Sequence, residues 1–479
     1  MRQLPGMRAP SPLLLLLALT SFSAPVLAQP SPPSPQGTAP AQPPPGAPAP
    51  VVIPPLPDVN DPMLTPMAPA ARNLATLEEA LGLVKARSTD LRFAYLETER
   101  AAAQTRIALA GLLTNINGTG FLTKNLITRT SDQPFVGSVT TPTPDIFANG
   151  TLTLVQPIVN VRNIHSWGTA KEFEKVQQLS LEDTQRKLSL NLANALVGVV
   201  TAERLAELNR AGFRTTLERL DLTRRRRTLG AATGLDVARA QLDAESARAA
   251  IVGGDESLRQ AREALGLAVG LPEQVGVSKE LNIDGLERAA LSACKIAPSI
   301  DARADIAAAR QRVLVAERGA DNVKLQFLPS LNAQSGLSTT TLDTGAAPTT
   351  TWNIQAVLAV PIWDGGVRYG ALRDANAAAR EAEAVLEGLR RNAIVQLDQA
   401  KRGVSVAESA LKVSTDTRAL AAETDRLVRT GYAEGQFTSL DLVTAAATLR
   451  NADIDLALKE FGLVQARILA ILSLASCPF

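Results

Sequence analysis

Few side chains in this sequence are arranged for catalysis or metal binding. His165 is the only histidine, and it stands apart from cysteines and carboxylate clusters, so it makes a poor metal ligand. Ser, His and Asp residues show no hydrolase spacing, and no glycine-rich phosphate loop is present. The sequence therefore predicts no enzyme, no metal site and no cofactor, and it predicts a structural or exposed role for His165.

One run of like charges precedes a turn between two long helical segments. Arg224 to Arg227 is a run of four arginines, which is compatible with nucleic acid or anionic lipid. The chain is nearly neutral, with a net charge of +2, so a solvated helix face is the favoured interpretation and no nucleic acid partner is expected. Contact with another protein or with peptidoglycan is the weaker alternative.

The N-terminal region carries an export signal and then a linker. Arg2 and Arg8 precede an apolar stretch at 13–19, and small residues end the segment at Ala28, as in a cleavable secretory signal over 1–28. Pro, Ala, Gln, Ser and Gly dominate 29–70, which predicts a disordered, semi-rigid linker. A spacer is the favoured interpretation of this Pro-rich linker, and a docking ligand is the alternative.

Cys294 and Cys477 are the only cysteines, and neither follows the predicted cleavage site. A lipid anchor is therefore not expected. Pairing of the two is possible in an oxidising compartment, but a long helical protein does not require it, so both states stay open. Beyond the signal, no segment has the length of a membrane-spanning helix, so entry into a membrane would require strands.

The chain contains an internal duplication. Leu154–Ile158, with the sequence LVQPI, is echoed by LAVPI at Leu358–Ile362, and the two prolines are 204 residues apart. Each of these apolar strands is expected to stop at its proline. A period of this size in a chain with few catalytic candidates favours an architectural role.

A second pair of similar segments supports the same division. Gly230 to Asp236 recurs as Gly431 to Asp441, with the first glycines 201 residues apart. We place the first repeat at 71–271 and the second at 272–479. Glycines 230, 234, 431 and 435 suit turns at helix ends, where a positive φ is often needed.

Each repeat is expected to hold helices around one strand pair. Thr76 and Glu79 form a capping-box pattern that begins the first helix. The strands are predicted at about 112–122 and 150–157, and at about 330–340 and 351–361, because the hydrophobic period there changes from 3.6 to 2. Ile354, Ala356, Leu358 and Val360 share one face of the last strand, and Asn353 and Gln355 share the other.

Very long helical patterns follow the strand pairs. They cover Ala170 to about Thr228 and Ala371 to about Thr430, and a helix returns after each. Leu192, Leu196 and Val199 mark an apolar stripe, as expected of helices packed along their length. Four strands cannot close a barrel, and lipid does not tolerate open edges, so copies of the chain must complete the sheet.

The sequence resembles the TolC-like outer-membrane efflux proteins of Gram-negative bacteria from about 72 to 472. The order and duplication of several short motifs carry the resemblance. These motifs are Thr76-Leu77-Glu78-Glu79-Ala80-Leu81, Leu112-Leu113, Val155-Gln156-Pro157-Ile158, Phe327-Leu328-Pro329-Ser330-Leu331, Val360-Pro361-Ile362-Trp363-Asp364-Gly365-Gly366 and Gly435 with Leu440-Asp441-Leu442.

The resemblance implies a mainly α fold with a membrane β-barrel part. It implies a homotrimer in which long helical hairpins form a periplasmic α-barrel and four strands from each chain form a twelve-stranded barrel in outer-membrane lipid. The implied function is the passive exit duct of a tripartite efflux pump or type I secretion system, working with a periplasmic adaptor and an inner-membrane pump. Its cargo would be small molecules, metals or proteins. The alternative is a non-conducting periplasmic coiled-coil protein, which would not need the four strands.

The resemblance also assigns roles to the helical tips. Gly230, Gly234, Gly431 and Gly435 match the adaptor-docking tips. Asp236, Asp441 and Tyr432 match gate positions, where acidic rings attract cations and exclude anions. Phe437 replaces the basic gate partner frequent in the family, and Thr444 replaces a second acidic ring. An N-cap role for Asp236 and Asp441 is an equal alternative to gating.

Two tryptophans follow the strand pairs, Trp167 in the first repeat and Trp363 in the second. Indoles are favoured at membrane boundaries, and they also pack well at strand-to-helix junctions. Both interpretations stay open.

Overall fold

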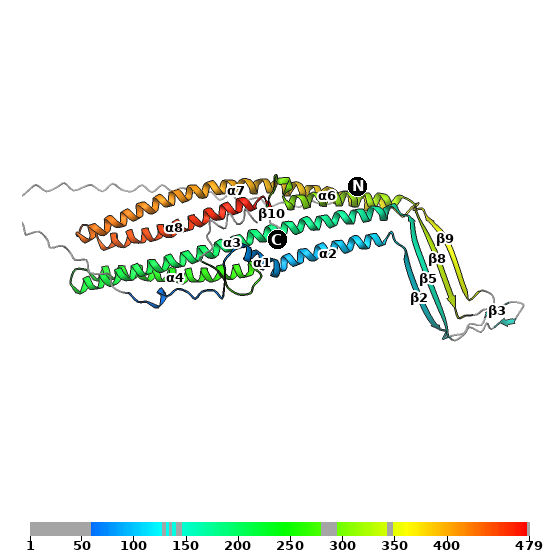
Figure 1. Cartoon of the computed structure of the whole chain (residues 1–479), viewed down its shortest axis with the longest axis horizontal. Coiled ribbons are helices and arrows are strands. Elements are labelled where there is room, and N and C mark those ends of the chain that lie inside the picture. The colour runs from blue at the N-terminus through cyan, green and yellow to red at the C-terminus, as the bar shows by residue number, and fades with distance from the viewer. Residues whose placement is uncertain are drawn as a thin grey trace, which may run out of the picture. The chain divides into compact units, whose positions relative to one another are not determined.

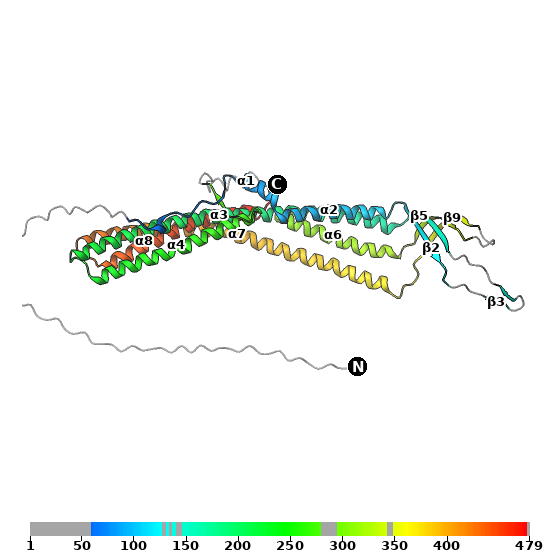
Figure 2. The same cartoon turned by 90° about the horizontal axis from the view of Figure 1, so that it is seen from below.

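The computed structural model describes residues 59–126, 131–133, 137–139, 146–278, 295–342 and 348–476. The predicted signal, residues 29–58 of the Pro-rich linker and residues 279–294 of the second repeat lie outside the described residues. Helices dominate the part that is described, and four long ones form two hairpins (Figures 1 and 2).

The helices differ greatly in length. The α-helices are α1 (Leu77–Arg87), α2 (Thr89–Ala110), α3 (Val161–Thr228), α4 (Gly234–Ala268), α6 (Ala304–Lys324), α7 (Val367–Ala433) and α8 (Ser439–Leu472). Short 3₁₀ turns are η1 (Pro62–Leu64), η2 (Ile300–Ala302) and η3 (Leu325–Phe327). No helix in this described part combines the length and hydropathy needed to cross a membrane.

The strands fall into one large sheet and several small pairings. The strands are β1 (Arg72–Leu74), β2 (Asn115–Lys124), β3 (Ser131–Gln133), β4 (Gly137–Val139), β5 (Ile146–Val159), β6 (Val275–Val277), β7 (Lys295–Ile296), β8 (Ser330–Thr340), β9 (Thr350–Ala359) and β10 (Ala475–Ser476). The large sheet is antiparallel and has the order β2-β5-β8-β9. The β5–β8 pairing therefore joins the strand pairs of the two repeats.

The long helices pack along their length. Helix α3 forms a hairpin with α4, α7 forms one with α8, and α3 also contacts α8, so the two hairpins lie side by side. Helices α2 and α6 continue beside α3 toward the sheet (Figure 1). The predicted apolar stripe is confirmed, because Leu192, Leu196 and Val199 are fully buried in the largest core cluster.

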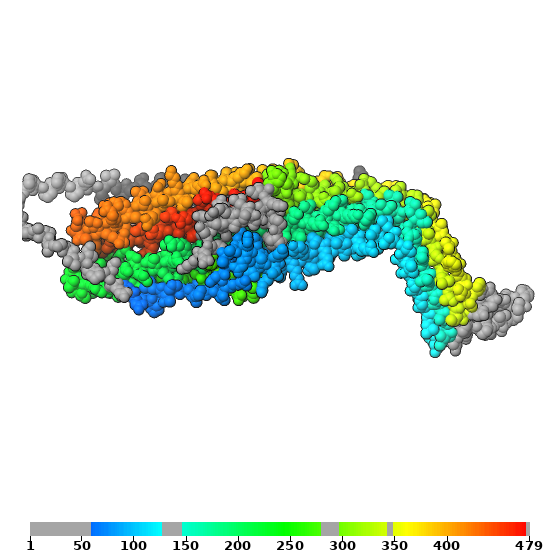
Figure 3. Space-filling view, viewed as in Figure 1, coloured from blue at the N-terminus to red at the C-terminus, as the bar shows by residue number. Residues whose placement is uncertain are grey.

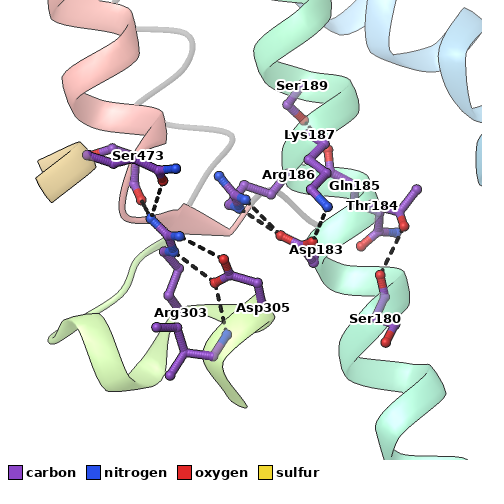
Figure 4. A network of polar contacts seen from close by, with 12 residues as sticks. Ser180, Asp183, Thr184, Gln185, Arg186, Lys187, Ser189, Arg303, Asp305 and Ser473 are labelled. Carbon is purple, nitrogen blue, oxygen red and sulfur yellow. Dashed lines mark hydrogen bonds and ion pairs between the residues drawn. The ribbon is translucent and has the colours of Figure 1, made fainter. Parts of the chain in front are cut away.

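A polar network near this core joins the start of α6 and the end of α8 to the interior of α7 (Figure 4). Arg303, which is 5% exposed, donates two hydrogen bonds to Asp305, at 2.8 Å from Nε and 2.7 Å from Nη2. Its Nη1 donates to Gln396 of α7 at 3.3 Å and to the Ser473 carbonyl oxygen at 3.5 Å. One guanidinium thus ties the start of α6 to α7 and to the end of α8.

The large sheet has two chemically different faces. The pairing register places apolar residues of all four strands on one face. That face includes Ile116, Leu122, Leu152, Leu154, Leu331, Leu337, Trp352, Ile354 and Leu358. Asn353 and Gln355 lie on the other face, as the alternation predicted. Several apolar side chains stay exposed in the single chain, including Leu122 and Ile354.

The expectation that proline ends both apolar strands is wrong for the first repeat. Pro157 lies within β5, where β2 no longer runs beside it, because the β2–β5 register ends at Val155. The missing N–H of Pro157 therefore costs no bond to β2, and a bulge follows at Val159. In the second repeat Pro361 does follow the end of β9 at Ala359.

Part of the expected linker is an ordered strap on the α3/α4 hairpin, so the prediction of disorder up to residue 70 is wrong for this part. Asp61 pairs with Arg248 at 2.8 Å, and Arg262 donates to the Ala68 carbonyl oxygen at 2.9 Å. Met63 and Met67 pack on apolar clusters of the hairpin. The Pro-rich composition of the segment predicted disorder, although it includes a few apolar residues that pack on the hairpin. Figure 3 shows this dark blue segment lying along the green helices.

The structure also bears on the sequence predictions for His165 and for the two cysteines. The side chain of His165 is partly buried, with Nδ1 2.7 Å from Asn322 Oδ1, so its predicted structural role is confirmed. Strands β7 and β10 pair antiparallel up to Lys295 and Ser476. The cysteines next to them in the chain, Cys294 and Cys477, lie outside the described residues, and their pairing stays a prediction.

Glycine 266 allows the chain after α4 to fold back on the helix. A Cβ at Gly266 would lie 2.0 Å from the Glu273 carbonyl oxygen, whereas a Cβ at Gly253 of the same helix would meet nothing within 4 Å. We expect Gly266→Ala to destabilise the fold by about 1–3 kcal/mol through overpacking. Gly253→Ala is expected to stabilise it by up to about 1 kcal/mol through helix propensity. Thermal unfolding followed by circular dichroism measures both, and equal melting temperatures would contradict the steric argument.

Candidate functional site

The two hairpin tips are built on the same local plan. Helix α3 is followed by Gly230 with φ 74°, and the Ala231 N–H donates back to the Arg226 carbonyl at 2.8 Å. Helix α7 is followed by Gly435 with φ 82°, and the Gln436 N–H donates back to the Gly431 carbonyl at 2.7 Å. Both are left-handed C-terminal caps of the kind that favours glycine.

The structure corrects the sequence pairing of the tip glycines. Gly435, and not Gly431, is the equivalent of Gly230, so the earlier alignment of Gly230 with Gly431 is wrong. Gly234 begins α4 and Gly431 lies inside α7, so neither serves a positive φ. Gly431 is instead needed for close packing, because a Cβ there would lie 2.5 Å from Phe437 Cδ2.

Asp236 and Asp441 belong to capping boxes at the two tips. The N-cap residues are Thr233 and Thr438, so the suggestion that the aspartates are N-caps is wrong; they stand three residues later. The Asp236 carboxylate accepts from the Thr233 N–H at 2.8 Å, and the Asp441 carboxylate accepts from the Thr438 N–H at 2.9 Å. Each aspartate thus stabilises the start of a returning helix.

Two contacts link the first tip to the second within one chain. The Ser439 hydroxyl donates to Asp236 Oδ1, the oxygen that the capping box leaves free. The Arg226 guanidinium lies over the Tyr432 ring, with Cζ 4.9 Å from its centroid. The structure therefore brings two of the three predicted gate residues, Asp236 and Tyr432, into tip-to-tip contacts.

The tip carboxylates are ionised at neutral pH. The hydrogen bond from Ser439 and then those from Thr233 lower the pKa of Asp236, and the hydrogen bonds from Thr438 lower the pKa of Asp441. Because the folded-state pKa of each carboxylate lies below its unfolded value, its stabilising contribution is present above the unfolded pKa. That contribution is lost only as the pH falls through the lowered value. Mild acidification therefore leaves these contacts in place.

The remaining predicted tip residues lie nearby in other roles. Phe437 packs against Gly431 of its own tip, and the Thr444 hydroxyl donates to the Leu440 carbonyl oxygen of its own helix at 2.9 Å. Asp441 Oδ1 meets no hydrogen-bond donor among the described residues. The four-arginine run was expected to form a solvated helix face. This expectation holds only in part, because Arg226 contacts the second tip.

A buried charge cluster joins the two hairpins a few helical turns away from the tips. Sequence reasoning missed this cluster. Asp243 of α4 has a side chain only 5% exposed, and it accepts from Arg219 of α3 at 3.2 Å and from Arg450 of α8 at 2.9 Å. Arg219 and Arg450 also line a cavity of about 190 Å³. Burial lowers the pKa of Arg219, and Asp243 opposes this shift. A charge at a core-facing position of α4, between Ala240 and Ala247, was the available signal.

Known proteins are related to this chain in sequence. The family model described as outer membrane efflux protein matches residues 80–271 and 298–469. The toluene efflux pump outer membrane protein TtgC of Pseudomonas putida is 24% identical over 280 residues, which cover 58% of this chain and 57% of TtgC. The cation efflux system protein CusC of Escherichia coli is 24% identical over 286 residues, covering 58% of this chain and 59% of CusC. The chain thus spans somewhat over half the length of these relatives.

Solved structures show the same fold. The crystal structure of CusC superposes with a TM-score of 0.72 at 19% identity, covering 88% of this chain and 99% of that one. The outer membrane protein VceC of Vibrio cholerae superposes with a TM-score of 0.68 at 19% identity, covering 83% of this chain and 95% of VceC. The mainly α fold with its four-stranded sheet is therefore confirmed.

Asp243 is expected to be essential for the packing of the two hairpins. Asp243→Asn removes the carboxylate that two largely buried guanidinium groups share, which we expect to cost about 3–5 kcal/mol of stability. Thermal unfolding by circular dichroism measures this loss. Glu423→Gln is the control, since Glu423 pairs with Arg426 on the surface of α7, and it should barely change the melting temperature. Equal effects of the two substitutions would show that the buried cluster contributes nothing special.

Proposed function

Because the chain belongs to the outer membrane efflux protein family, we propose that three copies of it form a passive exit duct across the outer membrane. The observation that carries this proposal is the sheet β2-β5-β8-β9. Its apolar face is exposed, and within the part of the chain that the structure describes, its outer strands β2 and β9 each pair on one side only. Lipid tolerates such a sheet only if its edges are paired. Three copies edge to edge would give a closed barrel of twelve strands.

A second uncovered surface supports assembly along the helices. Exposed apolar residues recur every seven residues on α7. They are Val406, Val413, Leu420 and Leu427, which are 65%, 64%, 70% and 51% exposed. The buried α7 residues Ser414 and Ala421 stand one position later, about 100° around the helix. The exposed stripe therefore faces a different direction from these buried residues, as expected of a helix wall closed by neighbouring copies.

The hairpin tips are the proposed entrance and docking site. In this proposal Gly230, Gly234, Gly431 and Gly435 shape the tips for a periplasmic adaptor, and an inner-membrane pump supplies the energy. Asp236 and Tyr432 hold the entrance closed through Ser439 and Arg226, and Asp441 turns its free oxygen toward the neighbouring copies. The catalytic alternative has no support in the family, which consists of efflux proteins.

In this proposal the cargo is determined by the pump that works with the duct, and not by membership of the family. TtgC is named for toluene and CusC for cations, so related ducts serve different pumps. A duct of this kind need only admit what its pump delivers. The non-conducting coiled-coil alternative is less favoured, because it gives no reason for a four-stranded sheet with an exposed apolar face.

The trimer is tested at the α7 stripe. We expect Leu420→Glu to place a carboxylate in the contact between copies and to shift the protein from trimers to monomers in detergent. Size-exclusion chromatography with light scattering measures the mass. Thr415→Glu is the matched control, because Thr415 is exposed on the same helix about 140° away from Leu420. Trimers of unchanged stability in Leu420→Glu would contradict the interface.

The gate is tested at Tyr432, where the ring and the hydroxyl make separable contributions. The ring faces Arg226, whereas no hydrogen bond to the Tyr432 hydroxyl is found among the described residues. We therefore expect Tyr432→Leu to raise the ratio of open to closed channels in planar lipid bilayers by about ten- to a hundredfold. A cation–π contact contributes about 0.5–1 kcal/mol per chain, and all three chains of the proposed trimer lose it. Tyr432→Phe should behave as the wild type.

A double-mutant cycle completes the test of the gate. Arg226→Ala should resemble Tyr432→Leu, and combining the two should add little, because both remove one interaction. Opening by Tyr432→Phe as large as by Tyr432→Leu would show that the hydroxyl holds the gate instead. Absence of any channel in the wild type and in all variants would overturn the duct itself.

A further inference from the structure

The polar face of the large sheet carries no charged side chain among the described strand residues. Its members are mostly Asn, Thr, Ser and Gln. They are Asn115, Asn117, Thr119, Phe121 and Thr123 of β2, Phe147, Asn149, Thr151, Thr153 and Val155 of β5, Asn332, Gln334, Gly336, Ser338 and Thr340 of β8, and Thr351, Asn353, Gln355 and Val357 of β9. Lys124, the one charged residue of these four strands, falls on the opposite face at the loop end of β2.

Polar groups on this face bond to one another across the strands. The Gln355 amide donates to Gln334 Oε1 at 3.1 Å, and the Gly336 N–H donates to Asn353 Oδ1 at 3.2 Å. The hydroxyls of Thr119 and Thr151 also share a hydrogen bond. These mutual bonds leave a surface of oriented but neutral dipoles. Such a surface is wettable, and it has no fixed charge to concentrate one sign of ion.

The apolar face fixes which way this neutral face points. Ile116, Leu152, Leu337 and Ile354 lie on the same face in adjacent strands, so that face must meet lipid once the sheet enters a membrane. Trp352 adds its ring there, and its indole N–H donates to the Ser335 hydroxyl at 2.9 Å, which satisfies that polar atom on the lipid side. The neutral face is then left for the water-filled interior.

We propose that the barrel interior of this duct does not discriminate by charge. Small cations, anions and neutral solutes pass the strand-lined interior alike, and selection by charge belongs to other parts of the duct, such as the helical tips with Asp236 and Asp441. This inference rests on the proposed function, since it assigns the neutral face to a lumen. It deepens that function, because the solute class admitted by the barrel is set by size and not by sign.

The test uses two adjacent residues of β8 that face opposite ways. Ser338→Cys and Leu337→Cys are made separately in the full chain, reconstituted in liposomes and treated from outside with a cationic or an anionic methanethiosulfonate reagent. Each rate is divided by the rate of the same reagent with a small thiol in solution. For Ser338→Cys we expect the two normalised rates to agree within about threefold. A preference for the cationic or the anionic reagent above about tenfold would overturn the inference.

A matched pair of variants calibrates the measurement. Thr151 lies directly opposite Ser338 in the β5–β8 register. Thr151→Asp and Thr151→Asn are each combined with Ser338→Cys. Thr151→Asp places one carboxylate per copy on the interior face, so the ratio of cationic to anionic normalised rates should be about tenfold higher than with Thr151→Asn. If Thr151→Asp changes nothing, the interior is already dominated by other charges and the inference fails.

The Leu337→Cys variant separates failure of this inference from failure of the proposed function. A cysteine facing lipid should react slowly with both charged reagents. If it reacts as fast as Ser338→Cys, the apolar face is in water and the outer-membrane duct itself is wrong, whatever the charge preference at position 338. The wild type, with its native Cys294 and Cys477, sets the background rate.

Discussion

Unpaired backbone at the edges of one sheet is the constraint on which the rest of this structure depends. One chain supplies four strands to this sheet, and β2 and β9 leave a row of N–H and C=O groups without partner strands among the described residues. In lipid each unsatisfied group costs several kcal/mol, so the cost of two open edges exceeds the whole stability of a typical domain. Pairing of these edges with further copies of the chain removes this cost. The exposed apolar stripe of α7 is compatible with such an assembly.

The exposed stripe of α7 follows from the same requirement. Once strands from several copies join in a ring, the helices that continue from them are brought side by side. A helix in such a wall needs apolar residues in two directions, toward its own hairpin partner and toward the next copy. Helix α7 has both, with Ala421 buried and Leu420 exposed in the single chain. The duplication supplies a second helix of similar length, α3, in the other hairpin.

Sequence reasoning found what periodicity encodes and missed what depends on tertiary position. Alternation placed Ile354 and Asn353 on opposite faces, and the stripe through Leu192 and Leu196 is buried as predicted. Asp243 was missed because a carboxylate in a helical sequence is ordinarily predicted to be solvent-exposed. Its partners, Arg219 and Arg450, are far away in the sequence and become neighbours only in the fold. The tip glycines were paired wrongly because backbone φ, which distinguishes Gly435 from Gly431, leaves no mark in composition.

The polar contacts form a hierarchy that suits a gate. Breaking the buried cluster around Asp243 costs about 3–5 kcal/mol, whereas the exposed contact of Arg226 with Tyr432 contributes about 0.5–1 kcal/mol. A bound partner can shift an equilibrium only by its differential affinity for the two states. In the proposed duct, a few kcal/mol from an adaptor at the tips would be enough to separate the tip contacts in every copy, while the buried cluster keeps the two hairpins of each chain together. Opening is then a local rearrangement near the turns, and the barrel need not change.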